Sequence, residues 1–132
     1  MQHVQVAAGI IWNSGRFLAA RRPEGKPRAG FWEFPGGKQE PGESMEQTLC
    51  RELREELGIH CRRVVPWRVV EHDYPDLRVT LHFMHVLDFT GTPSPHDGQE
   101  LRWSTPEEAL LLDFLPADRG ILAAIRLLPD RA

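Results

Sequence analysis

The segment SMEQTLCRELREELG, residues 44–58, constrains the fold most, because an apolar stripe and an acidic face share one predicted helix. Ser44 and Gln47 are spaced as a capping box, which favours a helix start, and Gly58 is a typical helix end. Four apolar residues follow at intervals of four and predict one buried face: Met45, Leu49, Leu53 and Leu57. The helix is therefore expected to pack its apolar side on a core and to point its glutamates away from it.

Segments on both sides of this helix have the pattern of strands and turns. Residues 4–12 and 16–22 predict two strands joined by a turn at 13–15. Residues 61–74 and 78–89 predict an antiparallel hairpin. A short strand, a short helix opened by a second capping box and a final amphipathic helix are predicted at 100–104, Thr105–Glu108 and 116–128. We therefore expect a single domain over 1–132 of the α+β class, an α/β/α sandwich with a mixed central sheet flanked by helices.

The charge and hydropathy of the chain exclude several classes of function. Its net charge is −3 at pH 7, so no broad cationic surface is expected for stable binding to nucleic acid. The longest apolar run, residues 6–12, is far too short to span a bilayer, and the first residues lack the pattern of a secretory signal. We therefore expect a cytoplasmic protein with no nucleic-acid or membrane partner, either a monomer or a homodimer.

Glu52, Glu55 and Glu56 stand at positions i, i+3 and i+4 and therefore share one face of the predicted helix. Like charges at these spacings disfavour a helix by about 0.2–0.5 kcal/mol per pair. One interpretation is a solvated charged face on which Arg51 pairs with Glu55. That pair leaves two glutamates without a counter-charge, and a hard divalent cation with oxygen ligands would relieve their repulsion.

The loop before the helix, PGGKQEPGE at residues 35–43, adds flexible backbone, a lysine and the carboxylate of Glu43. Loop and helix together read Gly37, five residues, Glu43, seven residues, and then RELREELGI at 51–59. This spacing resembles the Nudix box, G-x5-E-x7-R-E-U-x-E-E-x-G-U with U aliphatic, and every fixed position is filled. The chain is therefore identified as a member of the Nudix family, which hydrolyses a nucleoside diphosphate linked to another group.

The resemblance implies a site for Mg²⁺, or for Mn²⁺, on the acidic face of this helix. The implied ligands are the carboxylates of Glu52, Glu55 and Glu56 and the backbone carbonyl of Gly36. Glu52 is also the implied candidate for orienting or deprotonating the attacking water, while Glu43 and Arg51 brace the glutamates. Divalent cations there would invert the acidic field, bind the phosphates and activate a bound water.

Four further stretches resemble the MutT-type branch of the family: AAGIIW, AARRP, GFWEFPGGK and VTLHF. That branch cleaves 8-oxo-dGTP to a nucleoside monophosphate and pyrophosphate, which sanitises the nucleotide pool used in DNA replication and repair. The resemblance implies that Arg22 contacts substrate phosphate and that Glu100 binds metal or assists the water. A solvated arginine and a loop carboxylate are the respective alternatives. Lys38 is a further phosphate candidate because it lies in the metal loop, and a solvated lysine is the alternative.

Three residues are candidates near the base of a nucleotide: Glu33, Phe34 and Phe83. Aromatic residues on short strands more often belong to a core than to a stacking platform, so a core position is the alternative for both phenylalanines. One position departs from the MutT pattern, since MutT reads the oxidised guanine with an asparagine in the run PAN and this chain has PAD, with Asp118. An ionised aspartate only accepts hydrogen bonds, which suits the amino group of cytosine or the N1–H and amino edge of guanine.

The PAD run and STPEEAL also resemble the CTP pyrophosphohydrolase branch, which takes cytidine nucleotides, modified ones such as 5-methyl-dCTP included. The alternative for Asp118 is the N-cap of the final helix. We expect a nucleoside-triphosphate pyrophosphohydrolase, with 8-oxo-dGTP slightly favoured over cytidine nucleotides because the N-terminal half matches MutT so well. The base, the number of metal ions and the choice between Glu52 and Glu100 as general base stay open at this level.

Two other functions are alternatives. A hydrolase of ADP-ribose or of dinucleoside polyphosphates is the first. Other branches of the family carry a proline or a tyrosine that is typical of their substrate beyond the box, and Tyr74-Pro75 lies near that place. The second is a non-catalytic module that binds oxidised guanine. It is disfavoured, because such modules lack a complete box and this chain retains every glutamate.

Overall fold

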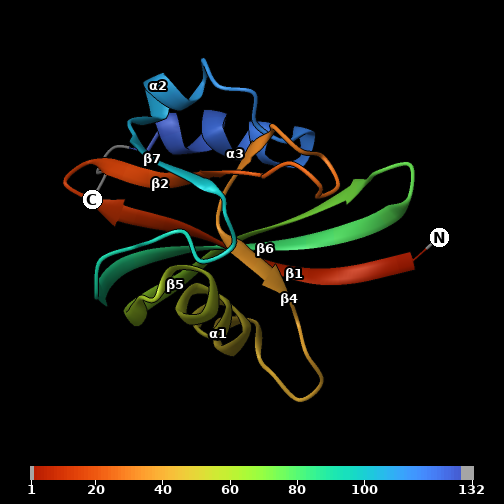
Figure 1. Ribbon diagram of the computed structural model, residues 1–132, viewed down its shortest axis with the longest axis horizontal. Coiled ribbons are helices and arrows are strands. Elements are labelled where there is room, and N and C mark those ends of the chain that lie inside the picture. Colours follow the sequence, from red (N-terminus) through yellow and green to blue (C-terminus); the bar gives the residue numbers. More distant parts are fainter. Residues whose placement is uncertain (1, 129–132) are drawn as a thin grey trace.

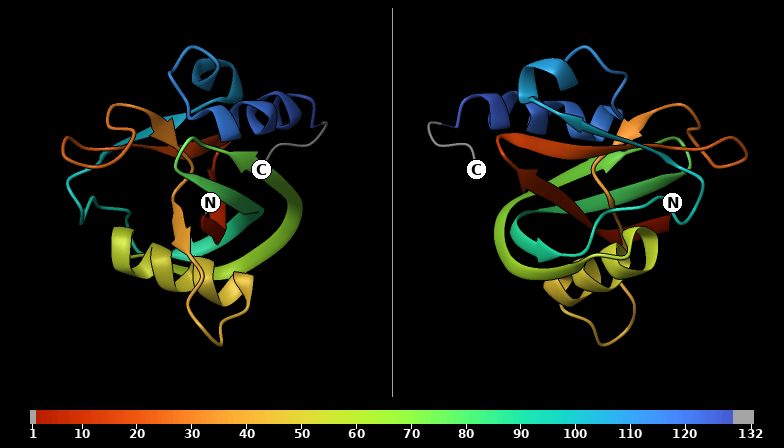
Figure 2. Two further views of the ribbon diagram at one scale, coloured as in Figure 1. Left: turned by 90° about the vertical axis from the view of Figure 1, so that its right-hand side faces the viewer. Right: turned by 60° about the vertical axis from the view of Figure 1, so that its left-hand side comes forward.

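A mixed seven-stranded sheet forms the middle layer of the molecule, with one helix on one face and two on the other (Figure 1). The computed structural model describes residues 2–128. In chain order its elements are β1 (Gln2–Asn13), β2 (Arg16–Arg21), β3 (Trp32–Glu33), β4 (Gly36–Lys38), α1 (Met45–Leu57), β5 (His60–Asp73), β6 (Leu77–Thr90), β7 (Glu100–Ser104), α2 (Pro106–Ala109) and α3 (Pro116–Arg126). Two further views show the same layers, and the predicted α/β/α sandwich is confirmed (Figure 2).

Strand β1 is the centre of the sheet. It pairs in parallel with β6 along residues 2–11, and on its other side it pairs antiparallel with β4 and then with β2. Strand β5 follows β6 at one edge, and both β3 and β7 pair with β2. Both predicted hairpins are confirmed. The first turns through Ser14 and Gly15, whose φ angles of 53° and 78° are those that a two-residue hairpin turn requires.

Two apolar cores lie on opposite faces of the sheet, because successive strand residues point to opposite sides. On the first face, Leu49, Leu53 and Leu57 of α1 are fully buried, as their spacing predicts. The second core lies beneath α2 and α3 and contains four buried phenylalanines: Phe17, Phe34, Phe83 and Phe114. The sheet thus holds α1 and α3 on opposite sides of β1.

Helix α1 begins and ends where its sequence predicts. The Ser44 hydroxyl accepts a hydrogen bond from the Gln47 backbone N–H at 3.1 Å, and the Gln47 side chain accepts one from the Ser44 N–H at 2.8 Å. Gly58 closes the helix in the left-handed conformation, with φ 72°. The second capping box, Thr105 with Glu108, opens α2 in the same way. None of the described helices is long and apolar enough to cross a membrane.

Candidate active site

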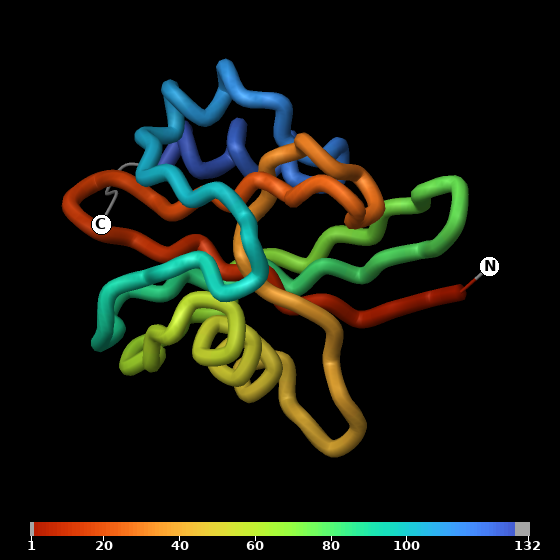
Figure 3. The backbone as a smooth tube through the Cα atoms, in the orientation of Figure 1, coloured from red at the N-terminus to blue at the C-terminus, as the bar shows by residue number. Residues whose placement is uncertain are grey.

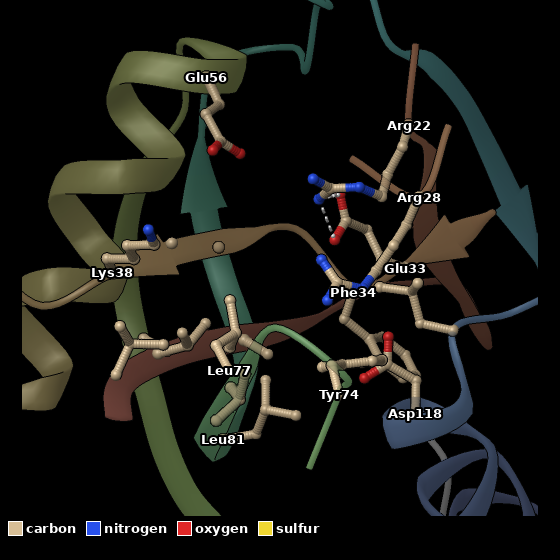
Figure 4. Close-up of a pocket in the computed structure, with 18 residues that line it drawn as sticks. Arg22, Arg28, Glu33, Phe34, Lys38, Glu56, Tyr74, Leu77, Leu81 and Asp118 are labelled. Carbon is tan, nitrogen blue, oxygen red and sulfur yellow. Dashed lines mark hydrogen bonds and ion pairs between the residues drawn. The ribbon is translucent and has the colours of Figure 1, made fainter. Parts of the chain in front are cut away.

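A cavity of about 290 Å³ lies between the α1–β4 side of the molecule and the start of α3 (Figure 4). Glu56 and Lys38 line one end, beside the two glycines of β4. Phe34, Tyr74 and Asp118 line the other end. The cavity therefore has a charged end, formed by the acidic helix and its loop, and an aromatic end that contains one acidic group.

The guanidinium of Arg51 organises the carboxylates of α1 and of the preceding loop. Its Nε and Nη2 donate to the two carboxylate oxygens of Glu43 at 2.6 and 3.0 Å. Its Nη1 lies 2.7 Å from Glu52 Oε1 and 3.3 Å from Glu55 Oε2. The hydrogen bonds from Arg51 lower the pKa of Glu43 to about 2, and the same pairing raises the pKa of Arg51. Glu43 and Arg51 thus have the geometry that a bracing role needs.

Glu56 lies deeper in the cavity than the other glutamates of α1. Burial raises the pKa of its carboxyl to about 9, and the charges of Glu52, Glu33 and Asp97 add to the shift. Without a metal ion, the cluster of carboxylates around Glu56 therefore keeps a proton at neutral pH, so that not every carboxylate in it is charged. A divalent cation would displace that proton, and the all-oxygen donor set fits a hard ion such as Mg²⁺ or Mn²⁺.

The metal ligands implied by the sequence are close together but not yet arranged around one point. Within residues 2–128, no three acidic, histidine or cysteine side chains converge closely enough to form a finished metal site. The reason is visible in the hydrogen bonds, because Arg51 holds both Glu52 and Glu55. A cation that binds here must therefore draw these two carboxylates away from the guanidinium.

Gly36 and Gly37 bring the backbone of β4 against β1 and α1. A Cβ at Gly36 would lie 1.9 Å from the carbonyl oxygen of Ala7, and a Cβ at Gly37 would lie 2.3 Å from the carboxyl carbon of Glu52. Neither position has room for a side chain. The glycines therefore allow Glu52 to lie directly against β4, at the charged end of the cavity.

Asp97, which was not among the predicted site residues, lies beside this acidic face. It lines a smaller cavity of about 110 Å³ together with Glu56 and Glu33, and its charge contributes to the raised pKa of Glu56. Glu100 lines neither cavity. Its exposed carboxylate lies 3.5 Å from Arg21 Nη1, because the pairing of β7 with β2 sets these two residues opposite each other. The role of Glu100 at the metal site therefore stays a prediction, and the structure adds Asp97 as a further carboxylate beside Glu56.

Three hydrogen bonds hold the loop that carries Asp97 to the end of α1. The backbone N–H groups of Ser94 and His96 donate to the carbonyl oxygens of Leu57 and Glu56, each at 3.0 Å. The imidazole Nδ1 of His96 lies 2.8 Å from the carbonyl oxygen of Glu55, which accepts its proton. The open carbonyls at the C-terminal end of α1 thus fix the position of Asp97.

Arg22 and Glu33 form a partly buried ion pair on the wall of the cavity (Figure 4). Arg22 Nη1 lies 3.1 Å from both carboxylate oxygens of Glu33, and Nε donates to the carbonyl oxygen of Pro27 at 2.7 Å. Burial raises the pKa of Glu33, and the charge of Arg22 opposes that shift. Arg22 thus reaches the cavity with its charge balanced, and its contact with substrate phosphate stays a prediction.

The structure separates the two phenylalanines that were predicted near the base. Phe34 lines the cavity while its ring packs against Phe17 and Phe114. Phe83 is fully buried on β6 and meets Phe34 edge-on, with 5.8 Å between the ring centroids. Because Phe83 does not line this cavity, it is a core residue, and the prediction of a base contact for it is corrected.

Asp118 lies in the first turn of α3, 3% exposed, at the aromatic end of the cavity. Leu115 is the N-cap of α3, so the alternative role of Asp118 as the cap is wrong. Burial raises the pKa of Asp118 well above its ordinary value, the charge of Glu33 adds to this, and a hydrogen bond with the Phe34 backbone opposes it. The environment thus favours a protonated carboxyl, which both donates and accepts hydrogen bonds, unlike the ionised group assumed from the sequence.

Replacing Asp118 by asparagine is expected to change how stability depends on pH. The folded protein holds the Asp118 proton more tightly than the unfolded chain, so wild-type stability falls as pH rises above the ordinary pKa of 3.8 towards the raised value. Asp118→Asn removes this titration. The unfolding free energy of the variant minus that of wild type should therefore increase with pH, by up to about 1.4 kcal/mol per pH unit. Urea titrations at increasing pH measure this difference. Exposed Asp113→Asn is the control, and parallel curves for Asp118→Asn and wild type would contradict the expectation.

Comparisons with known proteins identify the family of this chain. Residues 7–124 match the family described as the NUDIX domain. The chain belongs to the Nudix family. It is 46% identical over 126 residues to the CTP pyrophosphohydrolase of Escherichia coli (strain K12), which covers 94% of this chain and 92% of that protein. It is 36% identical over 127 residues to the 8-oxo-dGTP diphosphatase of the same strain, which covers 96% of this chain and 98% of that protein.

A solved structure of MutT, from Aliivibrio salmonicida and Vibrio cholerae, superimposes on this Nudix chain with a TM-score of 0.80. It is 35% identical and covers 93% of this chain and 96% of its own. The prediction of a MutT-type Nudix hydrolase is therefore confirmed. Nudix hydrolases generally use a divalent metal, and MutT-like enzymes act on small-molecule nucleotides.

Proposed function

We propose that this chain is a Mg²⁺-dependent nucleoside-triphosphate pyrophosphohydrolase that cleaves a (d)NTP to the (d)NMP and pyrophosphate. One observation carries the proposal: a single cavity joins the acidic face of α1 to a pocket lined by Phe34, Tyr74 and Asp118. The acidic end suits metal-bound phosphates, and aromatic side chains with one buried polar group suit a base. Mn²⁺ prefers the same oxygen ligands and is expected to replace Mg²⁺.

The residues of the Nudix box have different proposed roles at the charged end of the cavity. A divalent cation held by Glu52, Glu55, Glu56 and the carbonyl of Gly36 would neutralise the phosphates and make a bound water more acidic. Asp97, beside Glu56, supplies a further carboxylate to this end. Arg51 takes up the negative charge of the glutamates until the cation arrives and then, paired with Glu43, keeps them oriented.

Glu52 is the proposed general base. It lies against β4 at the charged end, where its carboxylate can accept a proton from a water that attacks phosphorus in line. Lys38 lines the same end and is the proposed contact for a phosphate oxygen. Arg22 is proposed to turn part of its guanidinium from Glu33 to phosphate when substrate enters.

Two bases are candidates, and each has its own supporting observation. 8-oxo-dGTP is supported by the 36% identical diphosphatase and by the raised pKa of Asp118, because a carboxyl that keeps its proton can donate to a carbonyl oxygen of the purine as an asparagine amide would. Cytidine triphosphates are supported by the 46% identical CTP pyrophosphohydrolase, since the same carboxyl can accept from the cytosine amino group and donate to N3.

The test is pyrophosphate release in the presence of Mg²⁺ from 8-oxo-dGTP, dGTP, CTP, dCTP, 5-methyl-dCTP and ADP-ribose, compared as kcat/KM. We expect turnover of at least one of the triphosphates, loss of activity on chelation, and recovery on adding Mg²⁺ or Mn²⁺. A preference for 8-oxo-dGTP places the enzyme in nucleotide-pool sanitising, and a preference for CTP or dCTP places it in cytidine nucleotide turnover. Release of no pyrophosphate from any triphosphate would overturn the proposal.

Asp97 and Glu100 give a matched pair of substitutions for the metal site. Asp97→Asn removes a carboxylate beside Glu56, so the Mg²⁺ concentration for half-maximal activity should rise by about 10- to 100-fold. Glu100→Gln removes an exposed carboxylate paired with Arg21 and should leave that concentration unchanged. The Mg²⁺ dependence of pyrophosphate release measures both. The reverse ranking would assign the metal contact to Glu100 in place of Asp97.

We further propose that residues 1–132 act as one Nudix domain, since both cores share β1. A free nucleotide substrate requires no nucleic-acid partner and no membrane. The proposed place of action is the cytoplasm, with its nucleotide pool, and the working form is a monomer or a homodimer.

A further inference from the structure

Arg28 links two loops at the aromatic end of the cavity. Its guanidinium carbon lies 4.0 Å from the centre of the Tyr74 ring, and Nη2 forms an ion pair with Asp76. The loop 22–31 thereby meets the turn between β5 and β6, drawn in orange and green in Figure 3. These segments are more than forty residues apart in the sequence, and only the folded chain brings them together.

The side chain of Arg28 is held in a defined position. It is 22% exposed, and stacking on the Tyr74 ring together with the ion pair fixes the plane of the guanidinium. Its backbone adopts φ 59°, a left-handed conformation that is costly for a residue other than glycine. Gly30, two residues further on, also has a positive φ, 87°, and the Phe31 N–H donates to the Arg28 carbonyl oxygen at 3.3 Å, which closes a tight turn.

Tyr74 in turn connects Arg28 to the acid of the base pocket. Tyr74 and Asp118 both line this end of the cavity, and the pKa of Tyr74 is raised by burial and, in addition, by the nearby Asp118 carboxyl. Figure 4 shows Arg28, Tyr74 and Asp118 on the same side of the cavity, away from Glu56. One cationic donor and one carboxyl therefore lie on the wall that the proposed function assigns to the base.

Most N–H groups of the Arg28 guanidinium form no hydrogen bond with the described part of the chain. A guanidinium carries five N–H groups, and within residues 2–128 only Nη2 of Arg28 is engaged, by Asp76. By contrast, Arg22 places both Nη1 and Nε in hydrogen bonds to Glu33 and Pro27. A partly buried guanidinium with unused donors beside an apolar wall favours an acceptor oxygen in the same place.

We propose that Arg28 is a specificity-determining residue that donates a hydrogen bond to a carbonyl oxygen of the substrate base. The inference rests on the proposed function, whose substrates are nucleotides. The chemistry it selects is a base with an exocyclic oxygen, either O2 of cytosine or a carbonyl oxygen of oxidised guanine. Adenine has no exocyclic oxygen and leaves this donor without that partner.

The first experiment compares Arg28→Gln and Arg28→Ala with wild type for CTP, 8-oxo-dGTP and dATP. Loss of a hydrogen bond from a charged donor should lower kcat/KM for the substrate with the exocyclic oxygen by about 10- to 100-fold, chiefly through KM. Turnover of dATP should stay at its wild-type value. Arg78→Gln is the matched control, because Arg78 forms an ion pair with Asp73 on the same hairpin but does not line the cavity. A loss of equal size for all three nucleotides, or no loss, overturns the inference.

A pair of substrate analogues separates base contact from support of the loop. Sulfur is a weak acceptor, so wild type should lose activity on 2-thio-CTP relative to CTP, and Arg28→Gln should lose no more on that analogue. If oxidised guanine is the source of the oxygen, Arg28→Gln should instead abolish the wild-type preference for 8-oxo-dGTP over dGTP. The pairs are CTP with 2-thio-CTP and 8-oxo-dGTP with dGTP. If the loss caused by Arg28→Gln and the loss caused by the change of substrate simply add in both pairs, Arg28 supports the loop without touching the base.

Binding of the reaction products tests the role of Arg28 separately from the proposed function, because binding requires no turnover. Calorimetric titration with CMP, 8-oxo-dGMP and AMP measures base recognition without turnover. If wild type hydrolyses no triphosphate, the proposed function fails. The role of Arg28 still stands in that case if CMP or 8-oxo-dGMP binds more tightly than AMP and Arg28→Gln removes the difference. Equal binding of the three products by wild type and Arg28→Gln overturns it.

Discussion

Glu52→Gln is expected to lower kcat by about 100- to 10,000-fold with little change in melting temperature, because the amide cannot accept the proton of the attacking water. The carboxylate lies at the charged end of the cavity, against Gly37 and 2.7 Å from Arg51 Nη1. Arg51 keeps Glu43 as its partner in the variant, so the helix and its loop retain their main ion pair. Single-turnover pyrophosphate release and a thermal unfolding curve measure the two quantities.

Glu46→Gln is the control for this substitution, since Glu46 is an exposed glutamate in the first turn of the same helix. It removes the same charge from α1 and should leave kcat at its wild-type value. Near-normal turnover of Glu52→Gln would exclude Glu52 as the general base. The same loss for both variants would point to the overall charge of the helix.

Gly37→Ala is expected to lower kcat/KM by about 100-fold, because a Cβ at this position would lie 2.3 Å from the Glu52 carboxyl carbon and must push the carboxylate aside. The atom that must move is the far end of a side chain. The free energy of unfolding should therefore fall by only about 1–3 kcal/mol, as for ordinary overpacking. Steady-state kinetics and urea unfolding of the same preparation separate the two effects.

Gly120→Ala is the matched control, because a Cβ at Gly120 in α3 meets no atom within 4 Å. It should raise the unfolding free energy by about 0.5–1 kcal/mol, as alanine does in a helix interior, and leave kcat/KM unchanged. Full activity of Gly37→Ala would show that Glu52 does not need its place against β4. Loss of the folded state would instead show that the clash is transmitted to the sheet.

The sequence predicts α1 and the residues around it well because the interactions involved are local. The capping box joins residues three apart, the leucine stripe repeats every turn, and the salt bridge from Arg51 to Glu55 spans four residues. The hairpin through Ser14 and Gly15 is likewise local, since Gly15 adopts its positive φ without steric cost. Spacing within the box therefore places Glu52, Glu55 and Glu56 on one face before any tertiary contact forms.

The base end of the site could not be predicted in the same way. Phe34 and Phe83 have the same chemistry and similar strand neighbours, yet one lines the cavity and the other is fully buried. Asp97 and Glu100 lie in one short run, HDGQE, and only the hydrogen bonds of the loop to α1 and the pairing of β7 with β2 tell them apart. Each choice depends on contacts between segments that are distant in the sequence.

The sequence by itself thus determined the Nudix helix, its acidic face and the α+β class, because periodicity, caps and spacing act over a few residues. Only the tertiary structure decided that Asp97 lies beside that face, that Asp118 is buried with a raised pKa, and that Arg28 reaches the cavity beside Tyr74 and Asp76. The physical reason is that burial and long-range distances fix desolvation and charge coupling. Both arise when β1 brings α1, α3 and the β5–β6 turn around one cavity.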